Sequence, residues 1–387
     1  MTDAHAVRAL LEPEHLELAA AAEAFATETL AGRRPPEDDA EGRTRAREYL
    51  VSLGEGGWLD RIESQDLRAC CLVREALAAA SPLADAVFAV QALAATPILL
   101  FANDETRERW LSALIAGDAM GAFAMTEPGA GSDVQSLATT AVKDGDHYVL
   151  NGRKSFISNA GIADVYIMFA STDPGAGSRA LSTFVVPADA EGFSFAGAQV
   201  MSAPHPLGEL ELDDCRIPAA AMLGEEGDGF KIGMATLDRL RPTVAAAACG
   251  MAERALTEAI GHALERHQFG QVLADFQLIQ QKLARMATEL AAARFLVYRA
   301  AWEKDQGAER ITLEAAMAKA YATEAAQRIV DDAVQILGGR GVLADSVVDH
   351  LYRAVRALRI YEGTTEIQHL VIAGQVLKRY RERGSAG

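Results

Sequence analysis

Apolar residues recur at helical spacing through the first 118 residues. Breakers interrupt the pattern, among them a proline-containing polar linker, a glycine-rich turn and the helix-start pair Asn103-Asp104. The spacing predicts an all-helical N-terminal domain over residues 1–118. Its alanine-rich amphipathic helices are expected at residues 14–31, 40–53, 64–80, 83–101 and 105–115.

The spacing changes near residue 119, where short runs rich in β-branched or aromatic residues replace the helical pattern. Turn residues separate the runs, and we interpret residues 143–146 as a turn and Asn151-Gly152 as a hairpin signal. A compact antiparallel, β-barrel-like domain is therefore predicted over residues 119–226. Its strands are expected at residues 139–142, 148–150, 165–170, 182–186 and 209–212.

Helical spacing returns after Gly227 and continues to the end of the chain. Long helices joined by short connections predict an antiparallel bundle over residues 227–387, and its alanine-rich faces allow close packing within and between subunits. The fold class is thus mainly α with a central β domain. The bundle helices are expected at residues 230–267, 277–306, 312–337, 345–357 and 364–383.

Charge and composition exclude several classes of protein. With 37 Lys and Arg against 54 Asp and Glu, the formal charge of −17 argues against a nucleic-acid binder, which needs clustered cations to neutralise phosphates. The four cysteines lack metal-ligand spacing and are expected to be buried free thiols in a reducing compartment. The apolar run at residues 84–101 contains Gln91 and Pro97, so we expect a buried helix and no membrane insertion. The N-terminus lacks an apolar signal stretch, and a cytoplasmic location is expected.

Residues 360–368 place a carboxylate, Glu362, directly before a glycine and two threonines. Glycine and threonine both weaken a helix, so the stretch serves something other than helix stability. If Gly363 permits close backbone approach and the threonines cap the next helix, Glu362 is held as a positioned acid or base. An ordinary surface turn is an equal alternative from this stretch alone.

Residues 124–133 form a second informative stretch, rich in small residues and free backbone N–H groups. Such a loop suits the close approach of a phosphate or a flavin-sized anion. It is not a P-loop, since no Gly-Lys-Ser or Gly-Lys-Thr follows, and it lacks the strand-turn-helix context of a dinucleotide fingerprint.

Four motifs together make the pattern specific. Thr-Glu-Pro-Gly-Ala-Gly-Ser-Asp at 126–133, Arg-His-Gln-Phe-Gly at 266–270, Gln-Ile-Leu-Gly-Gly-Arg-Gly at 335–341 and Tyr-Glu-Gly-Thr at 361–364 stand in an order and spacing that resembles the acyl-CoA dehydrogenase family. The resemblance spans residues 14–377. It implies helices, a β-barrel-like domain and a C-terminal four-helix bundle, with FAD between the sheet and the bundle and a homotetramer or homodimer as the assembly.

The resemblance also implies the chemistry. Glu362 would be the base that removes an α-proton from an acyl thioester, while the β-hydrogen leaves as hydride to flavin N5. The thioester oxygen would accept hydrogen bonds from the Glu362 backbone N–H and a flavin ribityl hydroxyl, and each donor would lower the barrier by about 3 kcal/mol. An electron-transfer flavoprotein is the implied electron acceptor.

Binding residues follow from the same resemblance. For three of them other interpretations are open: Arg266 is otherwise a solvated helix-end cation, and Asp238 with Arg241 is equally well a structural ion pair. The implied residues are Met125, Thr126, Phe156 and Ser158 for the flavin ring; Gly131 and Ser132 for the pyrophosphate and thioester arm; Arg266, Phe269, Gln277, Gln335 and Gly339 for FAD across a subunit interface; Thr364 and Glu366 for FAD from the last helix; and Ser132, Asp238, Arg241, Tyr361 and Gly363 for substrate.

Some members of this family carry the base on an earlier bundle helix, at the position that is Leu240 here. Leucine cannot accept a proton, so Glu362 is the candidate base. Three departures concern substrate recognition: residues 202–208 replace a Ser-Asp-Thr-Arg-Gly type segment, Arg353-Ala354 replaces an Arg-Asp pair, and a Tyr-Gly-Gly loop is missing near residues 54–59. They motivate the hypothesis that the acyl group arrives on an acyl-carrier protein, which would require a local Lys or Arg patch.

Other readings remain. The same fold could act as an acyl thioester oxidase that uses oxygen, whereas a flavin monooxygenase has no need of Glu362. A di-iron bundle would use Glu366 and His369 as a Glu-x-x-His pair, but its partner motif at residues 12–15 lies beside a proline, which disfavours it. A flavin-free scaffold is a further alternative. The acyl chain is left open between short, branched, functionalised and cyclic aminoacyl groups.

Overall fold

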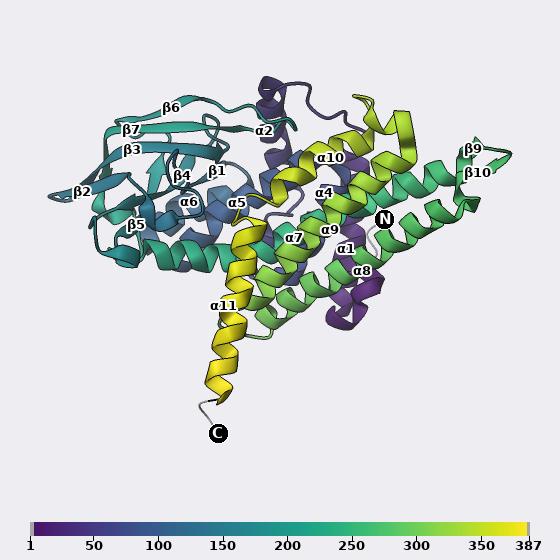
Figure 1. Ribbon diagram of the computed structural model, residues 1–387. Helices are drawn as coiled ribbons and strands as arrows, with labels where there is room; N and C mark the ends of the chain where they lie inside the picture. Colours follow the sequence, from purple (N-terminus) through teal and green to yellow (C-terminus); the bar gives the residue numbers. More distant parts are fainter. Residues whose placement is uncertain (1–3, 385–387) are drawn as a thin grey trace. The chain divides into compact units, whose positions relative to one another are not determined.

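The computed structural model describes residues 4–384 and divides them into two compact units (Figure 1). The helical unit contains the described residues up to Pro35, Asp66–Asp85, and the chain from Asp238 onward. The sheet unit contains Pro36–Gln65 and Ala86–Leu237. The expected fold class, mainly helical with a central β domain, is confirmed, whereas the three domain boundaries stay a prediction.

The helical unit is built from long helices that follow the alanine-rich periodicity. A small hairpin of β9 (His267–Gln268) and β10 (Gln271–Val272) joins α7 to α8, and the turn η7 (Gly338–Val342) follows α9. Figure 1 shows α7, α8 and α9 running side by side. The helices are α1 (Pro13–Phe25), α4 (Leu67–Ala80), α7 (Gly229–Glu265, from Asp238 onward), α8 (Gln277–Asp305), α9 (Thr312–Leu337), α10 (Val347–Leu358) and α11 (Thr365–Gly384), with the short turns η1 (Ala4–Leu10), η2 (Ala26–Leu30) and η6 (Leu273–Asp275).

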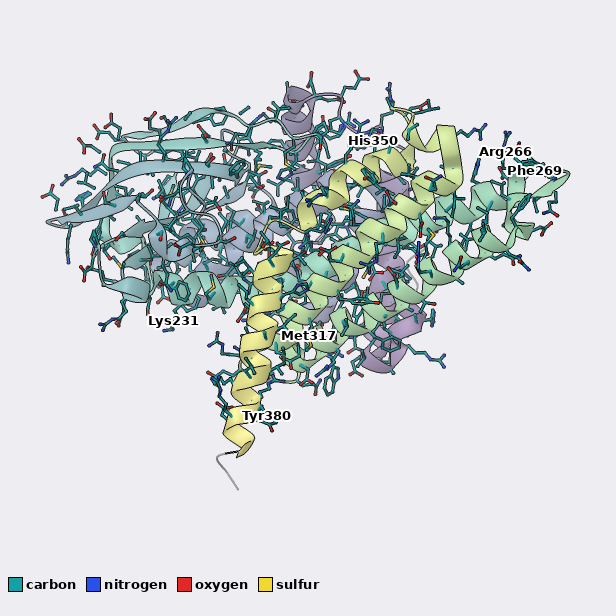
Figure 2. All side chains as sticks on the ribbon, viewed as in Figure 1. Lys231, Arg266, Phe269, Met317, His350 and Tyr380 are labelled. Carbon is teal, nitrogen blue, oxygen red and sulfur yellow. The ribbon has the colours of Figure 1, made fainter. Side chains whose placement is uncertain are left out.

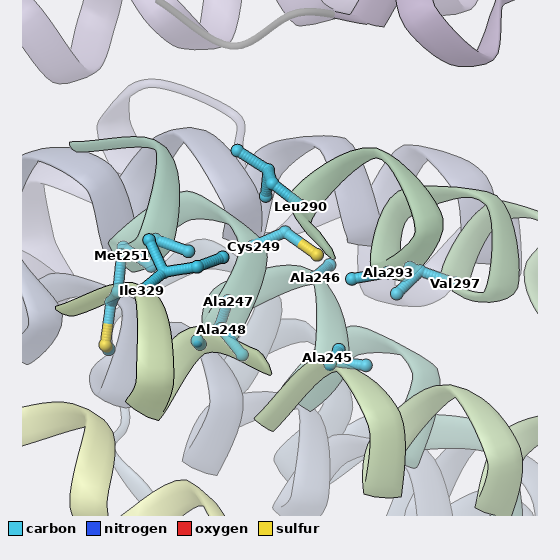
Figure 3. Close-up of a cluster of buried hydrophobic side chains, with 14 of the residues drawn as sticks. Ala245, Ala246, Ala247, Ala248, Cys249, Met251, Leu290, Ala293, Val297 and Ile329 are labelled. Atoms are coloured by element: carbon cyan, nitrogen blue, oxygen red, sulfur yellow. The ribbon is translucent and has the colours of Figure 1, made fainter. Parts of the chain in front are cut away.

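Small side chains form the centre of this unit. The run Val244–Ala248 on α7 is fully buried and packs with Leu290, Val297 and Ile329 from α8 and α9 (Figure 3). Small residues let helix backbones approach closely, which satisfies the need for dense packing without long side chains. The closest approach is at Gly250, where a Cβ would lie 2.0 Å from the backbone oxygen of Glu75 on α4.

The sheet unit carries one eight-stranded sheet. Its order is β6-β7-β3-β2-β4-β5-β8, and β1 pairs with β4 off this path. Every residue of β4 is buried, as expected for the middle of a core. The strands are β1 (Gly121–Ala124), β2 (Thr140–Asp144), β3 (His147–Ser158), β4 (Val165–Ser171), β5 (Leu181–Pro187), β6 (Phe193–Ala198), β7 (Leu207–Pro218) and β8 (Met222–Leu223); the helices are α2 (Asp39–Glu55), α3 (Asp60–Glu63), α5 (Pro82–Phe101, from Ala86 onward) and α6 (Asp104–Ala116), with the turns η3 (Val134–Ser136), η4 (Gly177–Arg179) and η5 (Ala219–Ala221).

Two expectations about the sheet are wrong. The sheet is not wholly antiparallel, because β1 and β2 both pair in parallel with β4. Asn151-Gly152 is not a hairpin; it lies inside β3 at a register shift, where a Cβ on Gly152 would come within 2.5 Å of the Thr139 hydroxyl oxygen. Glycine is required there by close approach. The β2–β3 hairpin turns at Gly145, within the predicted turn, with a φ of 63°.

The apolar segment and the cysteines behave as expected. Helix α5 is long and apolar enough to cross a bilayer, yet 78% of its most apolar window is buried inside the fold, as in a core helix. All four cysteines are buried and free. Asn103 caps α6 by accepting a 2.8 Å hydrogen bond from the Thr106 N–H, which confirms the helix-start signal.

The close approach at Gly250 generates a stability prediction. Gly250→Ala should lower the free energy of unfolding by about 3 kcal/mol, because the added methyl collides with the α4 backbone. Gly261→Ala on the same helix is the matched control: nothing lies within 4 Å of its Cβ, and alanine favours a helix by about 1 kcal/mol over glycine. Urea unfolding followed by circular dichroism checks both, and equal stability of the two variants would contradict the packing.

Candidate active site

Glu362 lies in a tight turn between α10 and α11 whose backbone is held in an unusual conformation. Its φ is 54°, and that of Gly363 is 92°. A non-glycine residue at positive φ is strained, and such strain persists only where surrounding contacts enforce it. The hydroxyl of Thr364 accepts a 3.3 Å hydrogen bond from the Ile367 N–H and so caps α11, as the sequence predicts.

The contacts that enforce the turn are hydrogen bonds to its two carbonyl oxygens. Arg241 Nε donates to the Glu362 oxygen at 3.0 Å, and Lys319 Nζ donates to the Gly363 oxygen at 2.6 Å. Gln368 Nε2 donates to both, at 3.3 and 3.0 Å. A Cβ at residue 363 would lie 2.5 Å from this same Gln368 nitrogen, so the turn requires glycine.

Arg241 is in turn fixed by an ion pair. Its NH1 lies 2.7 Å from Asp238 Oδ1, and Thr312 donates a 2.6 Å hydrogen bond to the other Asp238 oxygen. The ion-pair interpretation of Asp238 and Arg241 therefore holds, and the pair serves to position Glu362. A direct contact of either residue with substrate stays a prediction.

The Glu362 carboxyl is buried and incompletely paired. Its Oε2 atom has no hydrogen-bond partner within residues 4–384. Burial raises the pKa of Glu362, and the positive charges of Arg74, Lys319 and Arg241 oppose that rise. A buried carboxylate with raised pKa and one free oxygen is suited to accept a proton from a ligand.

Two groups beside Glu362 were missed by sequence reasoning. Arg74 is 1% exposed and forms a bidentate pair with Asp85, at 2.7 and 2.9 Å, and donates to the Thr243 hydroxyl at 2.8 Å. Burial lowers the pKa of Lys319 to about 8, while Glu362 raises it. A lysine on the mostly apolar, alanine-rich face of α9 was the one sequence signal available for Lys319.

The glycine-rich loop of the sheet unit is anchored by a second buried pair. Lys154 on β3 donates to Glu127 Oε1 at 2.7 Å, and Glu127 also accepts from the N–H groups of Ala138 and Thr139. Burial lowers the pKa of Lys154 to about 8, although Glu127 raises it. Met125 and Thr126 directly precede this anchor, and Lys154 also donates to the Met125 carbonyl at 3.3 Å.

The same unit presents features suited to a flat ring and an anion. Phe156 has a φ of 57° and a ring that is 61% exposed, while its N–H donates to Gln199 at 2.7 Å. Ser158 is hydrogen-bonded to His205 at 2.8 Å. Nothing lies within 4 Å of a Cβ built on Gly129 or Gly131, so the loop has open space beside it. Ser132 is exposed in the same loop. An exposed aromatic ring and an open small-residue loop fit a flavin nucleotide.

Two of the five residues predicted for a shared FAD site, Arg266 and Phe269, lie away from the start of α11 in one chain. Figure 2 shows Arg266 and Phe269 together at the hairpin tip, at the end of the helical unit distant from the start of α11. Phe269 is 94% exposed with a φ of 51°. The pKa of His262 is lowered by burial and by Arg340 and Arg266, which places both cations near this end. Arg266, Gln277, Gln335 and Gly339 are all exposed.

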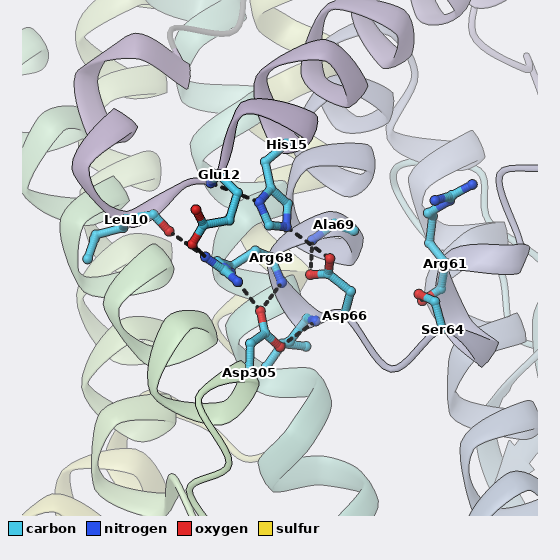
Figure 4. A network of polar contacts seen from close by, with 10 residues as sticks. Leu10, Glu12, His15, Arg61, Ser64, Asp66, Arg68, Ala69 and Asp305 are labelled. Carbon is cyan, nitrogen blue, oxygen red and sulfur yellow. Dashed lines mark hydrogen bonds and ion pairs between the residues drawn. The ribbon is translucent and has the colours of Figure 1, made fainter.

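The di-iron interpretation fails on the same unit. His15 uses both ring nitrogens, one 2.9 Å from Asp66 and the other accepting the Glu12 N–H at 3.0 Å (Figure 4). Glu12 and His15 thus form a helix cap. Across residues 4–384 the structure contains no group of three or more His, Cys, Asp or Glu side chains able to hold a metal ion.

Three sequence-family models match this chain along its length. The acyl-CoA dehydrogenase N-terminal domain matches residues 12–118, the middle domain residues 122–215, and the C-terminal domain residues 227–377. Among curated relatives, 3-(aryl)acrylate reductase of Clostridium sporogenes is 44% identical over 316 residues, covering 81% of this chain and 84% of the relative. Caffeyl-CoA reductase-Etf complex subunit CarC of Acetobacterium woodii is 43% identical, over 74% and 76% of the two chains.

Solved structures agree with these matches. Butyryl-CoA dehydrogenase of Megasphaera elsdenii has a TM-score of 0.88 at 36% identity, covering 95% of this chain and 99% of its own. A glutaryl-CoA dehydrogenase of Mycobacterium smegmatis in complex with FADH2 has a TM-score of 0.87 at 27% identity, covering 95% of each chain.

The raised pKa of Glu362 predicts a pH-dependent stability change. A carboxyl whose folded pKa lies above its unfolded value penalises folding once it ionises, so the penalty is absent below pH 4.5 and complete above the folded pKa. Glu362→Gln should therefore be more stable than wild type at pH 8, and this gain should shrink as the pH falls toward 5.

Glu366→Gln is the matched control for that experiment. Hydrogen bonds from its own N–H and from Thr364 lower the pKa of Glu366. Its ionised form is thus favoured by folding, and the variant should lose stability at pH 8, with the loss vanishing at low pH. Thermal unfolding midpoints across this pH range measure both, and a pH-independent effect of Glu362→Gln would contradict the burial argument.

Proposed function

The chain belongs to the acyl-CoA dehydrogenase family, and from this premise we propose that it catalyses the FAD-dependent α,β-dehydrogenation of an acyl thioester to the 2-enoyl thioester, with Glu362 as the base. Members of this family are oxidoreductases that act on CH–CH groups and use FAD. The observation that carries the proposal is the buried Glu362 carboxyl, whose Oε2 lacks a partner within the described chain.

In this mechanism Glu362 Oε2 takes the α-proton of the thioester. The electron pair of that C–H bond forms the new C=C bond as the β-hydrogen leaves with its two electrons. FAD, when bound, supplies the acceptor for this hydride. The raised pKa of Glu362 makes its carboxylate a stronger base than an exposed one. The difference between its pKa and that of the weakly acidic α C–H group is therefore smaller, which favours proton transfer.

The backbone of the same turn has a second task. The Glu362 N–H would donate to the thioester carbonyl oxygen, where negative charge develops as the proton leaves. Arg241 and Lys319 hold the two carbonyls of the turn, so donor and carboxylate keep a fixed relation to each other. Preorganised donors lower the barrier because they need no rearrangement during the reaction.

The resemblance to the family implies which residues would hold FAD. Phe156, Ser158, Met125 and Thr126 would contact the ring, with Gly131 and Ser132 at the pyrophosphate and thioester arm, and Thr364 and Glu366 near the cofactor from α11. Arg266 and Phe269 lie away from the start of α11 in one chain, which supports the proposal that they bind the FAD of a second copy, together with Gln277, Gln335 and Gly339. We therefore propose a homotetramer or homodimer, and a cytoplasmic location.

The names of relatives and one altered segment bear on the thioester carrier and the electron partner. Relatives that carry CoA in their names support a CoA thioester, while the altered segment at residues 202–208 supports an acyl-carrier protein. An electron-transferring flavoprotein is supported by the relative named as part of an Etf complex.

The reverse reaction is a second candidate. One relative is named as a 3-(aryl)acrylate reductase and another as a subunit of a caffeyl-CoA reductase-Etf complex. The same groups would then return a proton from Glu362 to the α-carbon after hydride reaches the β-carbon, since a reaction and its reverse share one transition state. The physiological direction depends on the electron partner.

Glu362→Gln should keep FAD bound and lose turnover by about a thousandfold or more, because glutamine is nearly isosteric but cannot accept a proton. Glu309→Gln, in the connection between α8 and α9, is the control and should retain wild-type turnover. Flavin absorbance measures cofactor content, and steady-state assay with an artificial electron acceptor measures turnover. Substantial activity in Glu362→Gln would require another base.

Anaerobic bleaching of the flavin identifies the thioester. Matched acyl groups, presented on CoA and on an acyl-carrier protein, should reduce the flavin at different rates, and the physiological carrier should be the faster by at least tenfold. If only thioesters of the acyl-carrier protein bleach the flavin, the proposal of a CoA thioester as substrate is wrong. No bleaching by any thioester, in either direction of the reaction, would contradict the proposed function.

A further inference from the structure

His205 lies in the segment that departs most from the family pattern, and the mechanism above leaves it unused. Its Nε2 is 2.8 Å from the hydroxyl oxygen of Ser158 at the end of β3. Both residues belong to the sheet unit. The contact joins chain positions 47 residues apart, so it is a tertiary feature of this fold.

Helix α2 fixes the backbone around His205. Arg43 donates from NH1 to the Ala160 oxygen at 2.5 Å and from NH2 to the Leu207 oxygen at 2.8 Å. Asp39 accepts from Arg43 Nε at 2.6 Å and so orients the guanidinium. Arg43 thereby ties the first residue of β7, which follows His205, to the turn after β3, which follows Ser158.

The imidazole is neutral at physiological pH. Burial and the nearby Arg43 lower the pKa of His205 to about 4, and Asp39 opposes the shift. A neutral imidazole nitrogen either donates or accepts, depending on its tautomer. If Nε2 donates, the Ser158 O–H stays free to donate to a ligand; if Nε2 accepts, the Ser158 oxygen keeps its lone pairs for a ligand N–H.

We propose that His205 is a positioning residue that orients the Ser158 hydroxyl against the polar edge of the bound flavin and thereby sets the flavin's reduction potential. This inference rests on the proposed function, in which Ser158 contacts the ring. Oxidised flavin presents ring nitrogens that accept hydrogen bonds, whereas two-electron reduction adds an N–H that donates. A serine paired with a neutral histidine can meet either need without a change in net charge.

The test is a double-mutant cycle on the holoenzyme with Ser158→Ala, His205→Phe and the double variant. His205→Phe should shift the two-electron reduction potential by about 30 mV, which is a tenfold change in the ratio of affinities for the two redox forms of FAD. Ser158→Ala should shift it as well, and the double variant should match Ser158→Ala alone, because His205 acts through Ser158.

Two variants separate positioning from general structural damage. His205→Gln retains a side-chain amide that can bond to Ser158, so it should restore most of the wild-type potential. His147→Phe, at the other end of β3, removes a histidine whose partner is the exposed Asp146, and it should leave the potential unchanged. Circular dichroism verifies that each variant is folded.

Several results would overturn the proposal: no shift in His205→Phe, additive shifts in the double variant, or no rescue by His205→Gln. Failure of the wild-type protein to bind FAD would instead remove the proposed function and this inference with it. The His205–Ser158 hydrogen bond is tested separately in FAD-free protein. There, Ser158→Ala should change the pKa of His205 measured by NMR. A titration unaffected by Ser158→Ala would show that the two side chains are not coupled.

Discussion

The helical unit depends on how its buried cations are satisfied. Taking a guanidinium or ammonium out of water is costly unless hydrogen bonds and opposite charges replace the hydration. Lys319 and Arg241 meet that requirement by donating to the carbonyl oxygens of residues 363 and 362, and Arg241 also pairs with Asp238. The same bonds that satisfy the cations hold Glu362 at positive φ. The hydrogen bonds that make the burial of these cations possible therefore also set the geometry of the active site.

Much of the fold was predictable because it follows from the local periodicity of apolar residues along the chain. Long helices with alanine-rich faces and the turn at Gly145 follow from spacing and turn chemistry, and all are confirmed. The hairpin prediction at Asn151-Gly152 was wrong because Gly152 is required by the close approach of Thr139. In the sequence, such a glycine cannot be told apart from a glycine in a hairpin turn. β1 and β6 were missed, since four and six residues without clear alternation give too little signal.

The residues of the candidate site were predictable only where they belong to the sequence motifs whose order and spacing resemble the family. Glu362 and the cap formed by Thr364 stand in one short stretch, so their relation is local. Arg74 with Asp85, Lys319, and His205 with Ser158 are pairs or contacts made by the folded chain across 11, 44 and 47 residues. No spacing rule connects such positions. Each is visible only after packing decides which polar groups are buried together.

The central claim is that Glu362 removes the α-proton of the thioester while the turn stabilises the negative charge that develops at the carbonyl oxygen. It is tested most directly by anaerobic exchange of the thioester α-hydrogen in D2O, followed by NMR, with the flavin reduced beforehand so that no hydride can leave. The account predicts rapid exchange in the wild-type protein and none above background in Glu362→Gln with FAD bound. Exchange at the wild-type rate in that variant would contradict it.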